Sequence, residues 1–95
     1  FIYGYFVEEQ LVGVIYVNRR ENIYYVDDIV VKDNYRNQGI GSELFRYIEK
    51  QALANNIVRI ELDVWSFNEK AIQFYQKNGF TPKTIRYEKI VKKEG

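Results

Sequence analysis

The sequence predicts an α+β domain in which helices pack on a mixed, mostly antiparallel sheet. Three observations indicate this fold class. Three apolar runs rich in Val, Ile and Tyr open the chain, an amphipathic helical pattern follows them, and a segment of alternating apolar and polar residues comes next. With 95 residues the chain has room for one core, and a chain of this size buries roughly 60–65% of its unfolded surface.

The opening runs predict three antiparallel strands, at about residues 1–8, 10–18 and 24–31. β-branched and aromatic residues dominate all three, as is typical of strands. The polar pair Glu8-Glu9 and the polar segment 19–22 separate them and predict two turns.

A helix is expected next, over residues 39–54. Apolar residues recur there every four positions, and charged residues take the other side. The apolar set is Ile40, Leu44, Ile48 and Ala52, joined by Phe45, and the charged set is Glu43, Arg46 and Lys50. This pattern predicts a helix lying on a sheet.

The segment after the helix, residues 57–64, predicts a fourth strand. We expect it to be buried at Ile60, Leu62 and Val64 and polar at Arg59, Glu61 and Asp63. Because a helix connects it to the strand at residues 24–31, the two should run parallel.

A second, short helix is expected between Asn68 and Gly79, since Asn caps a helix start and Gly a left-handed end. Residues 80–83 and 86–92 would close the sheet as a final hairpin. Neither a repeat nor a linker interrupts the pattern, so residues 1–95 are interpreted as a single domain.

The junction between the third strand and the first helix carries Arg36-Asn37-Gln38-Gly39-Ile40-Gly41. Glycines allow close approach of a ligand to the backbone, and a helix N-terminus offers unpaired N–H groups to a phosphate. Leu44 stands where a dinucleotide fingerprint needs a third glycine, and no Gly-Lys-Ser/Thr follows. Taken alone, the two glycines could simply begin a helix that packs tightly on a sheet.

A second motif decides between these interpretations. Asn-x-x-Ala-x-x-x-Tyr-x-x-x-Gly-Phe runs from Asn68 to Phe80, after the Arg-x-x-Gly-x-Gly of Arg36 to Gly41. In this order the two motifs resemble the GNAT family of N-acetyltransferases, of the bacterial small-molecule type. The resemblance runs from about residue 1 to 91. The family's usual first strand and two capping helices have no counterpart here, so an N-terminally truncated GNAT fold is expected.

The resemblance implies acetyl-CoA as the cofactor. In the family, the third and fourth of the present strands form a central parallel pair that splays apart, and the pantetheine arm lies in the gap. Asn68 would reach that arm, and Tyr75 would stand beside the sulfur. Backbone groups at Ile29, Val30 and Val31 would pair with the pantetheine. The pyrophosphate would lie on the loop of Arg36, Asn37, Gln38, Gly39, Ile40, Gly41 and Ser42, with the Arg36 side chain either near the phosphates or on the surface.

Acetyl transfer to an amine also needs a base, since freeing the lone pair of a lysine-like amine at pH 7 costs about 4–5 kcal/mol. Asp27 ranks just ahead of Asp28, because it matches the position of an acidic base in polyamine-acetylating relatives. Strand alternation is expected to send the two side chains to opposite faces of the sheet. The alternative without a catalytic role is that Asp27 and Asp28 are simply a solvated strand end. Glu61 and Asp63, on the adjoining strand, are the next candidates for the base.

Asp28, Glu61, Asp63 and Trp65 are the candidate acceptor-binding residues, and the carboxylates favour a cationic acceptor. Tyr75 is the candidate proton donor to the departing thiolate. A phenol has a reference pKa of about 10 and a thiol one of about 8.5, so a phenol can protonate a thiolate in part. An aromatic residue at this helical spacing is otherwise a core residue. The amine would attack directly in a ternary complex, with no covalent enzyme intermediate.

Composition narrows the chemistry further. The chain has no Cys, His or Met, which excludes a thiol nucleophile, a His-centred triad and a zinc site of the usual soft ligands. A net charge of +1 suggests neither nucleic acid nor membrane as a partner, and a cytoplasmic location is expected. Because the chain opens in a strand-like pattern without an initiator Met, we expect that it is part of a longer protein or that its start was lost. An uncovered edge strand predicts a homodimer.

The predicted function is therefore transfer of acetyl from acetyl-CoA to a small primary amine or a protein amino group. One alternative is a catalytically idle acyl-CoA-binding module, acting as a sensor or interaction domain. Another is a structural fragment that binds no CoA.

Overall fold

The computed structural model describes residues 1–93, in two compact units. The first unit spans Phe1–Trp65 and the second begins at Ser66. The prediction of a single domain over residues 1–95 stays a prediction.

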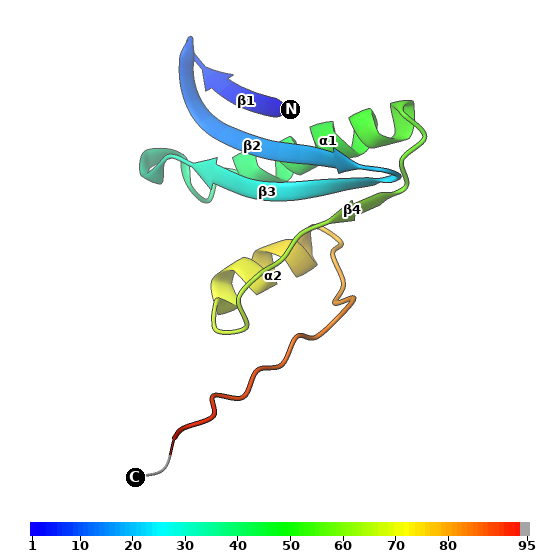
Figure 1. The fold of residues 1–95 in the computed structure, drawn as a ribbon. Coiled ribbons are helices and arrows are strands. Elements are labelled where there is room, and N and C mark those ends of the chain that lie inside the picture. The colour runs from blue at the N-terminus through cyan, green and yellow to red at the C-terminus, as the bar shows by residue number, and fades with distance from the viewer. Residues whose placement is uncertain (94–95) are drawn as a thin grey trace. The chain divides into compact units, whose positions relative to one another are not determined.

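The first unit is built on a four-stranded sheet with the order β1-β2-β3-β4 (Figure 1). Its strands are β1 (Ile2–Val7), β2 (Gln10–Arg20), β3 (Ile23–Val31) and β4 (Arg59–Glu61). β1, β2 and β3 pair antiparallel, and β4 joins β3 in parallel. The mixed, mostly antiparallel sheet and the first turn are as the sequence predicts, with Glu8 and Glu9 at positive φ. The second turn is shorter than predicted, because β2 continues to Arg20, and it contains Glu21 at positive φ.

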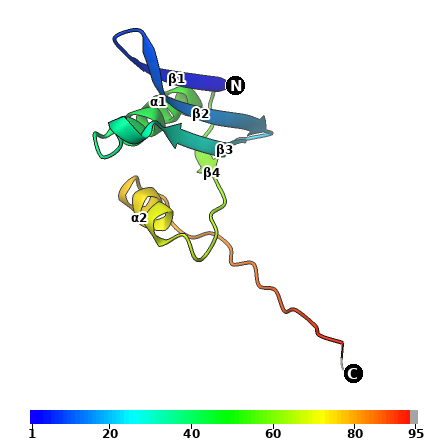
Figure 2. The ribbon, with the colours of Figure 1, turned by 90° about the vertical axis from the view of Figure 1, so that its left-hand side faces the viewer.

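Helix α1 (Ile40–Ala54) lies against one face of this sheet (Figures 1 and 2). All five apolar residues predicted for its buried side are buried. Gly13 of β2 lies under the helix, where an added Cβ would be 3.0 Å from Ile40 Cγ2 and 3.4 Å from Leu44 Cδ1. The helix therefore approaches the sheet backbone closely, and the core lies between them. Its buried apolar members are Val12, Ile15, Val17, Tyr24, Val26, Ile40, Leu44, Phe45, Ile48, Ala52 and Ile57.

The pairing of β2 with β3 contains a bulge at Asp27. Tyr16 pairs with Asp28 and Val17 with Val26, so Asp27 has no partner on β2. Val26, before the bulge, is buried, and Ile29, after it, pairs with the buried Ile15. Asp27 and Asp28 therefore both lie on the face of the sheet opposite α1. The prediction that they point to opposite faces is wrong, because an extra residue in one strand interrupts the alternation.

β4 is much shorter than the strand predicted over residues 57–64. It pairs with β3 at only three positions, the last being Tyr25 with Glu61. Beyond that point β3 continues to Val31 with no partner on this side in the described sheet, so the two strands separate. Ile60 is half-buried, but Val64 lies outside the strand and is 38% exposed. The prediction that Val64 is buried is therefore wrong.

The second unit contains α2 (Glu69–Lys77), with the cap and stop that the sequence predicts. The Ala71 backbone N–H donates to Asn68 Oδ1 at 3.3 Å. Gly79 has a φ of +90°, as a left-handed helix end requires. The predicted final hairpin is wrong, because residues 80–93 form no strand. Pro82 lacks a ladder donor, and a two-stranded hairpin alone is at best marginally stable in water.

Consequently, the parallel pair β3–β4 lies at one edge of the described sheet and β1 at the other. Among the described residues, no helix is both long and apolar enough to span a bilayer.

Candidate functional site

The start of α1 has the geometry of an anion-binding helix terminus. After β3 the chain forms a 3₁₀ turn, η1 (Asp33–Tyr35), then passes through Asn37 at a φ of +63° and Gly39 at +80°. Gly39 is the N-cap residue and offers no side-chain cap. The first-turn N–H groups of this helix are thus left to a ligand or water, at the positive end of the helix dipole.

Arg36 holds the loop that precedes this terminus. One guanidinium nitrogen lies 3.1 Å from Asp33 Oδ1, and Nε donates to the Val31 carbonyl at 3.5 Å. Gln38 Nε2 donates to the Asn34 carbonyl at 3.2 Å. The Arg36 side chain is 66% exposed, and an exposed ion pair of this kind is worth about 0–1 kcal/mol. A phosphate could therefore replace the Asp33 carboxylate at little cost.

The end of β3 leads directly into this loop. Ile29, Val30 and Val31 pair with β2 on one side, and none pairs with β4 on the other. On the β4 side, their backbone groups are placed to pair with an extended ligand, in the way that a peptide adds to a sheet edge, except for the Ile29 N–H, which donates to Asp28 Oδ1. The predicted pantetheine and pyrophosphate segments are therefore contiguous within the first unit.

Two carboxylates stand on β3 at the bulge, each held by a neutral donor. Asn18 Nδ2 donates to Asp27 Oδ2. Asp28 Oδ1 accepts from the backbone N–H of Ile29 at 2.8 Å. Both aspartates are exposed. These neutral donors orient the carboxylates without cancelling their negative charge.

A third carboxylate joins the same face from the other strand. The Tyr25 hydroxyl donates to Asp63 Oδ2, two residues beyond the last β3–β4 pair. The Arg20 guanidinium carbon lies 4.3 Å from the centroid of the Tyr25 ring. The hydrogen bond to Asp63 is the main cause that raises the pKa of Tyr25 above its ordinary value, with burial and nearby carboxylates adding to it and Arg20 opposing it.

Glu61 pairs with Tyr25 and so shares the face opposite α1, and it is half-buried. Trp65 ends the first unit and is 71% exposed. The structure thus brings Asp27, Asp28, Glu61 and Asp63 to one face. The sequence pattern did not identify the donors Asn18 and Tyr25, although the order of the strands places Asn18 on the strand beside Asp27 and Tyr25 on the strand beside the segment of Asp63.

The predicted residues Asn68 and Tyr75 belong to the second unit. Asn68 caps α2, and the Tyr75 ring packs edge-on against Phe80 with 5.9 Å between ring centroids. Tyr75 is half-buried within this arrangement. Its proposed place beside the cofactor sulfur stays a prediction.

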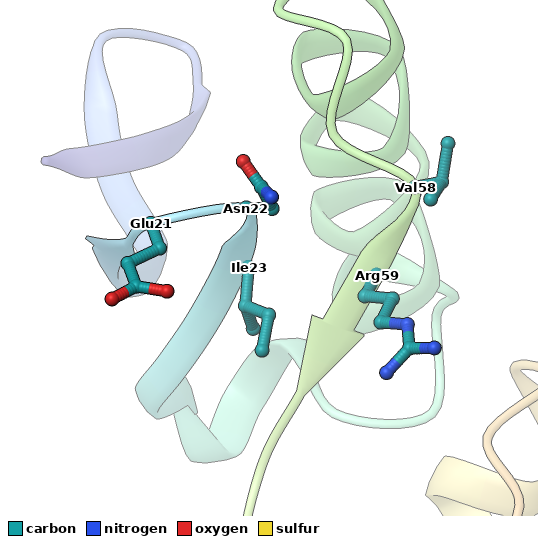
Figure 3. Close-up of a pocket in the computed structure, with 5 residues that line it drawn as sticks. All are labelled: Glu21, Asn22, Ile23, Val58 and Arg59. Carbon is teal, nitrogen blue, oxygen red and sulfur yellow. The ribbon is translucent and has the colours of Figure 1, made fainter.

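A pocket of about 370 Å³ lies away from these residues, at the start of β3, where its pairing with β4 begins (Figure 3). In Figure 3, Ile23 lies between Glu21, from the β2–β3 turn, and Arg59, from β4. Asn22 and Val58 complete the lining. None of the predicted site residues lines this pocket.

The family sequence model for acetyltransferases of the GNAT type matches residues 1–80 of the chain. The chain belongs to the GNAT acetyltransferase family. Its four-stranded sheet, parallel β3–β4 pair and two helices agree with the fold of structurally similar GNAT proteins. The family assignment thus agrees with the resemblance drawn from the two motifs.

Individual GNAT relatives are similar over part of their length. The streptothricin acetyltransferase of Escherichia coli is 34% identical over 80 residues, which are 83% of this chain and 46% of that protein. The thialysine N-epsilon-acetyltransferase of Sus scrofa is 38% identical over 55 residues, 58% of this chain and 32% of the other. The chain thus spans less than half the length of these relatives.

A solved structure is likewise similar to this chain over part of its length. A candidate streptothricin acetyltransferase from Bacillus anthracis strain Ames, crystallised with acetyl coenzyme A, superposes with a TM-score of 0.78 at 32% identity. The match covers 82% of this GNAT chain and 45% of that protein.

Proposed function

We propose that this GNAT chain carries the acetyl-CoA-binding and catalytic part of an N-acetyltransferase that acts on a primary amine. One observation carries the proposal. The uncapped N-terminus of α1 follows the stretch of β3 that has no β4 partner after a single loop, which places a candidate phosphate site next to a candidate strand-pairing site. Acetyl-CoA has a pyrophosphate and an amide-bearing arm in that order.

For the cofactor, the N–H groups from Gln38 to Ser42 would bind the pyrophosphate, assisted by Arg36. Ile29 and Val31 would pair with the pantetheine amides. Relatives support this choice, since the Bacillus anthracis protein was crystallised with acetyl coenzyme A.

For the acceptor, the face opposite α1 supplies negative charge beside the opening between β3 and β4. Asp27 and Asp28 lie on that face at the bulge, so either can take a proton from the amine, directly or through water. We keep Asp27 as the first choice, since Asn18 orients it. Asp28, Glu61, Asp63 and Trp65 are the proposed acceptor contacts. The Sus scrofa relative is named for transfer to the N-epsilon of thialysine, which favours an amine nitrogen as the acceptor.

For the leaving group, Tyr75 is the proposed proton donor to the thiolate, and Asn68 the proposed contact to the cofactor arm. The amine attacks the thioester carbonyl, the C–N bond forms, the C–S bond breaks, and the proton from the phenol goes to sulfur. Holding amine and thioester together can supply roughly 7–11 kcal/mol of the barrier reduction.

The test is release of free thiol from acetyl-CoA across a panel of amines, with Tyr75→Phe and a matched Tyr87→Phe control. Tyr87 is 86% exposed in the second unit and has no proposed role. Amine-dependent release that is lost in Tyr75→Phe and kept in Tyr87→Phe supports the proposal. Tight CoA binding with no release from any amine would replace it with the idle binding module.

A further inference from the structure

Tyr25 occupies the point at which β3 and β4 separate. It is the last residue of β3 that pairs with β4, opposite Glu61. Its hydroxyl reaches past that pair to Asp63, in the segment that follows β4. This side chain therefore ties the two sides of the opening together at its base.

The contacts of Tyr25 with Arg20 and Asp63 fix the orientation of the phenol and of the Asp63 carboxylate. Arg20 covers one face of the ring at 4.3 Å, which limits rotation of the phenol through a cation–π contact. The hydroxyl donates to a carboxylate oxygen, a charge-assisted hydrogen bond that is stronger than one between neutral groups. A phenol is also a neutral donor, so it orients Asp63 and leaves its charge in place. A lysine or arginine there would cancel it.

The protonation state suits this role. The Asp63 hydrogen bond raises the pKa of Tyr25 above 10.0. The phenol therefore keeps its proton, and its hydrogen bond to Asp63, at neutral pH.

We propose that Tyr25 is a positioning residue that holds the Asp63 carboxylate at the opening between β3 and β4, where Asp63 contacts the amine acceptor. This inference rests on the proposed function and deepens it. It identifies Asp63, among the carboxylates of the β4 side, as the one built to meet the acceptor. Glu61 is still within the paired part of the strand, whereas Asp63 lies where the strands have parted.

The experiment measures kcat, KM for the amine and KM for acetyl-CoA in Tyr25→Phe, Asp63→Asn and the double variant. Each single variant is expected to raise the amine KM about 3- to 10-fold, the range expected for the net contribution of one typical hydrogen bond at an exposed site. We expect kcat and the KM for acetyl-CoA to stay within about twofold, since the contact is made equally in ground and transition state. The double variant should be no worse than Asp63→Asn, because the two residues act as a unit.

Tyr24→Phe is the matched control. Tyr24 is the neighbouring residue on the same strand and faces α1, and its hydroxyl accepts a hydrogen bond from Asn55 Nδ2 at 3.2 Å. Loss of that hydroxyl should lower thermal stability and leave the amine KM unchanged. A purely structural role for Tyr25 would give the two variants the same kinetics.

The outcomes separate the two proposals. Turnover with an amine KM that is unchanged in Tyr25→Phe, or additive effects in the double variant, overturns the inference alone. No turnover by the unsubstituted chain with any amine overturns the proposed function and the inference together.

Discussion

Gly39→Ala tests whether the start of α1 must adopt its left-handed conformation to bind CoA. Gly39 has a φ of +80°, and a Cβ added there would meet nothing within 4 Å. The cost of an alanine is therefore backbone strain alone, about 1–2 kcal/mol for an L-residue in the left-handed region. For a chain of this size, that strain lowers Tm by about 4–16 °C. If the loop relaxes out of this conformation, a strain of this size reduces the fraction of molecules in the binding-competent conformation by up to about 5- to 30-fold. CoA affinity then falls by the same factor.

Two further variants separate stability from binding. Gly79→Ala imposes the same strain, since Gly79 has a φ of +90° and its added Cβ also meets nothing within 4 Å. We expect both alanine variants to melt earlier by similar amounts and only Gly39→Ala to bind CoA more weakly. Gly39→Asn should recover most of the loss, because Asn tolerates the left-handed region.

The assays are thermal unfolding by circular dichroism and CoA titration by calorimetry. An unchanged Tm in Gly39→Ala would refute the strain argument. Equal CoA affinity in Gly39→Ala and Gly79→Ala would remove the α1 terminus from the binding site.

Three other substitutions test the core, the tyrosine and the base. Gly13→Ala should lower the free energy of unfolding by about 1–3 kcal/mol through overpacking, since its Cβ would lie 3.0 Å from Ile40 Cγ2. Denaturant titration measures this change, and an unchanged unfolding midpoint would contradict close packing of α1 on the sheet. Asp63→Asn should lower the pKa of Tyr25, whose raised value gives stability that is present below pH 10 and lost as pH rises through the folded pKa. Tyrosinate absorbance then rises at lower pH than in the unsubstituted chain, and superimposable titrations would argue against the hydrogen bond. Asp27→Asn should reduce kcat for amine-dependent thiol release by about 10²- to 10⁴-fold, and an unchanged kcat would move the base to another group.

The parts of the fold that the sequence predicts are those fixed by local patterns. α1 follows from apolar residues at every fourth position, and the start of α2 from Asn68, whose side chain accepts a helix N–H. The final hairpin could not be predicted in the same way. A strand forms only where a ladder partner is available, and residues 80–93 form none despite their β-branched and aromatic residues. Val64 is exposed for a related reason, because β4 ends at Glu61.

The bulge at Asp27 changes the chemical argument more than any of these differences. Strict alternation would separate Asp27 and Asp28, which would exclude a shared role. The extra residue is visible only in the pairing of β2 with β3, since no local signal in Val26-Asp27-Asp28-Ile29 requires it. With both aspartates on the face opposite α1, the proposed reaction can use one as the base and the other as a contact for a cationic acceptor. The bulge also twists β3 where it parts from β4, so the irregularity that alternation misses helps to form the opening that the proposed reaction needs.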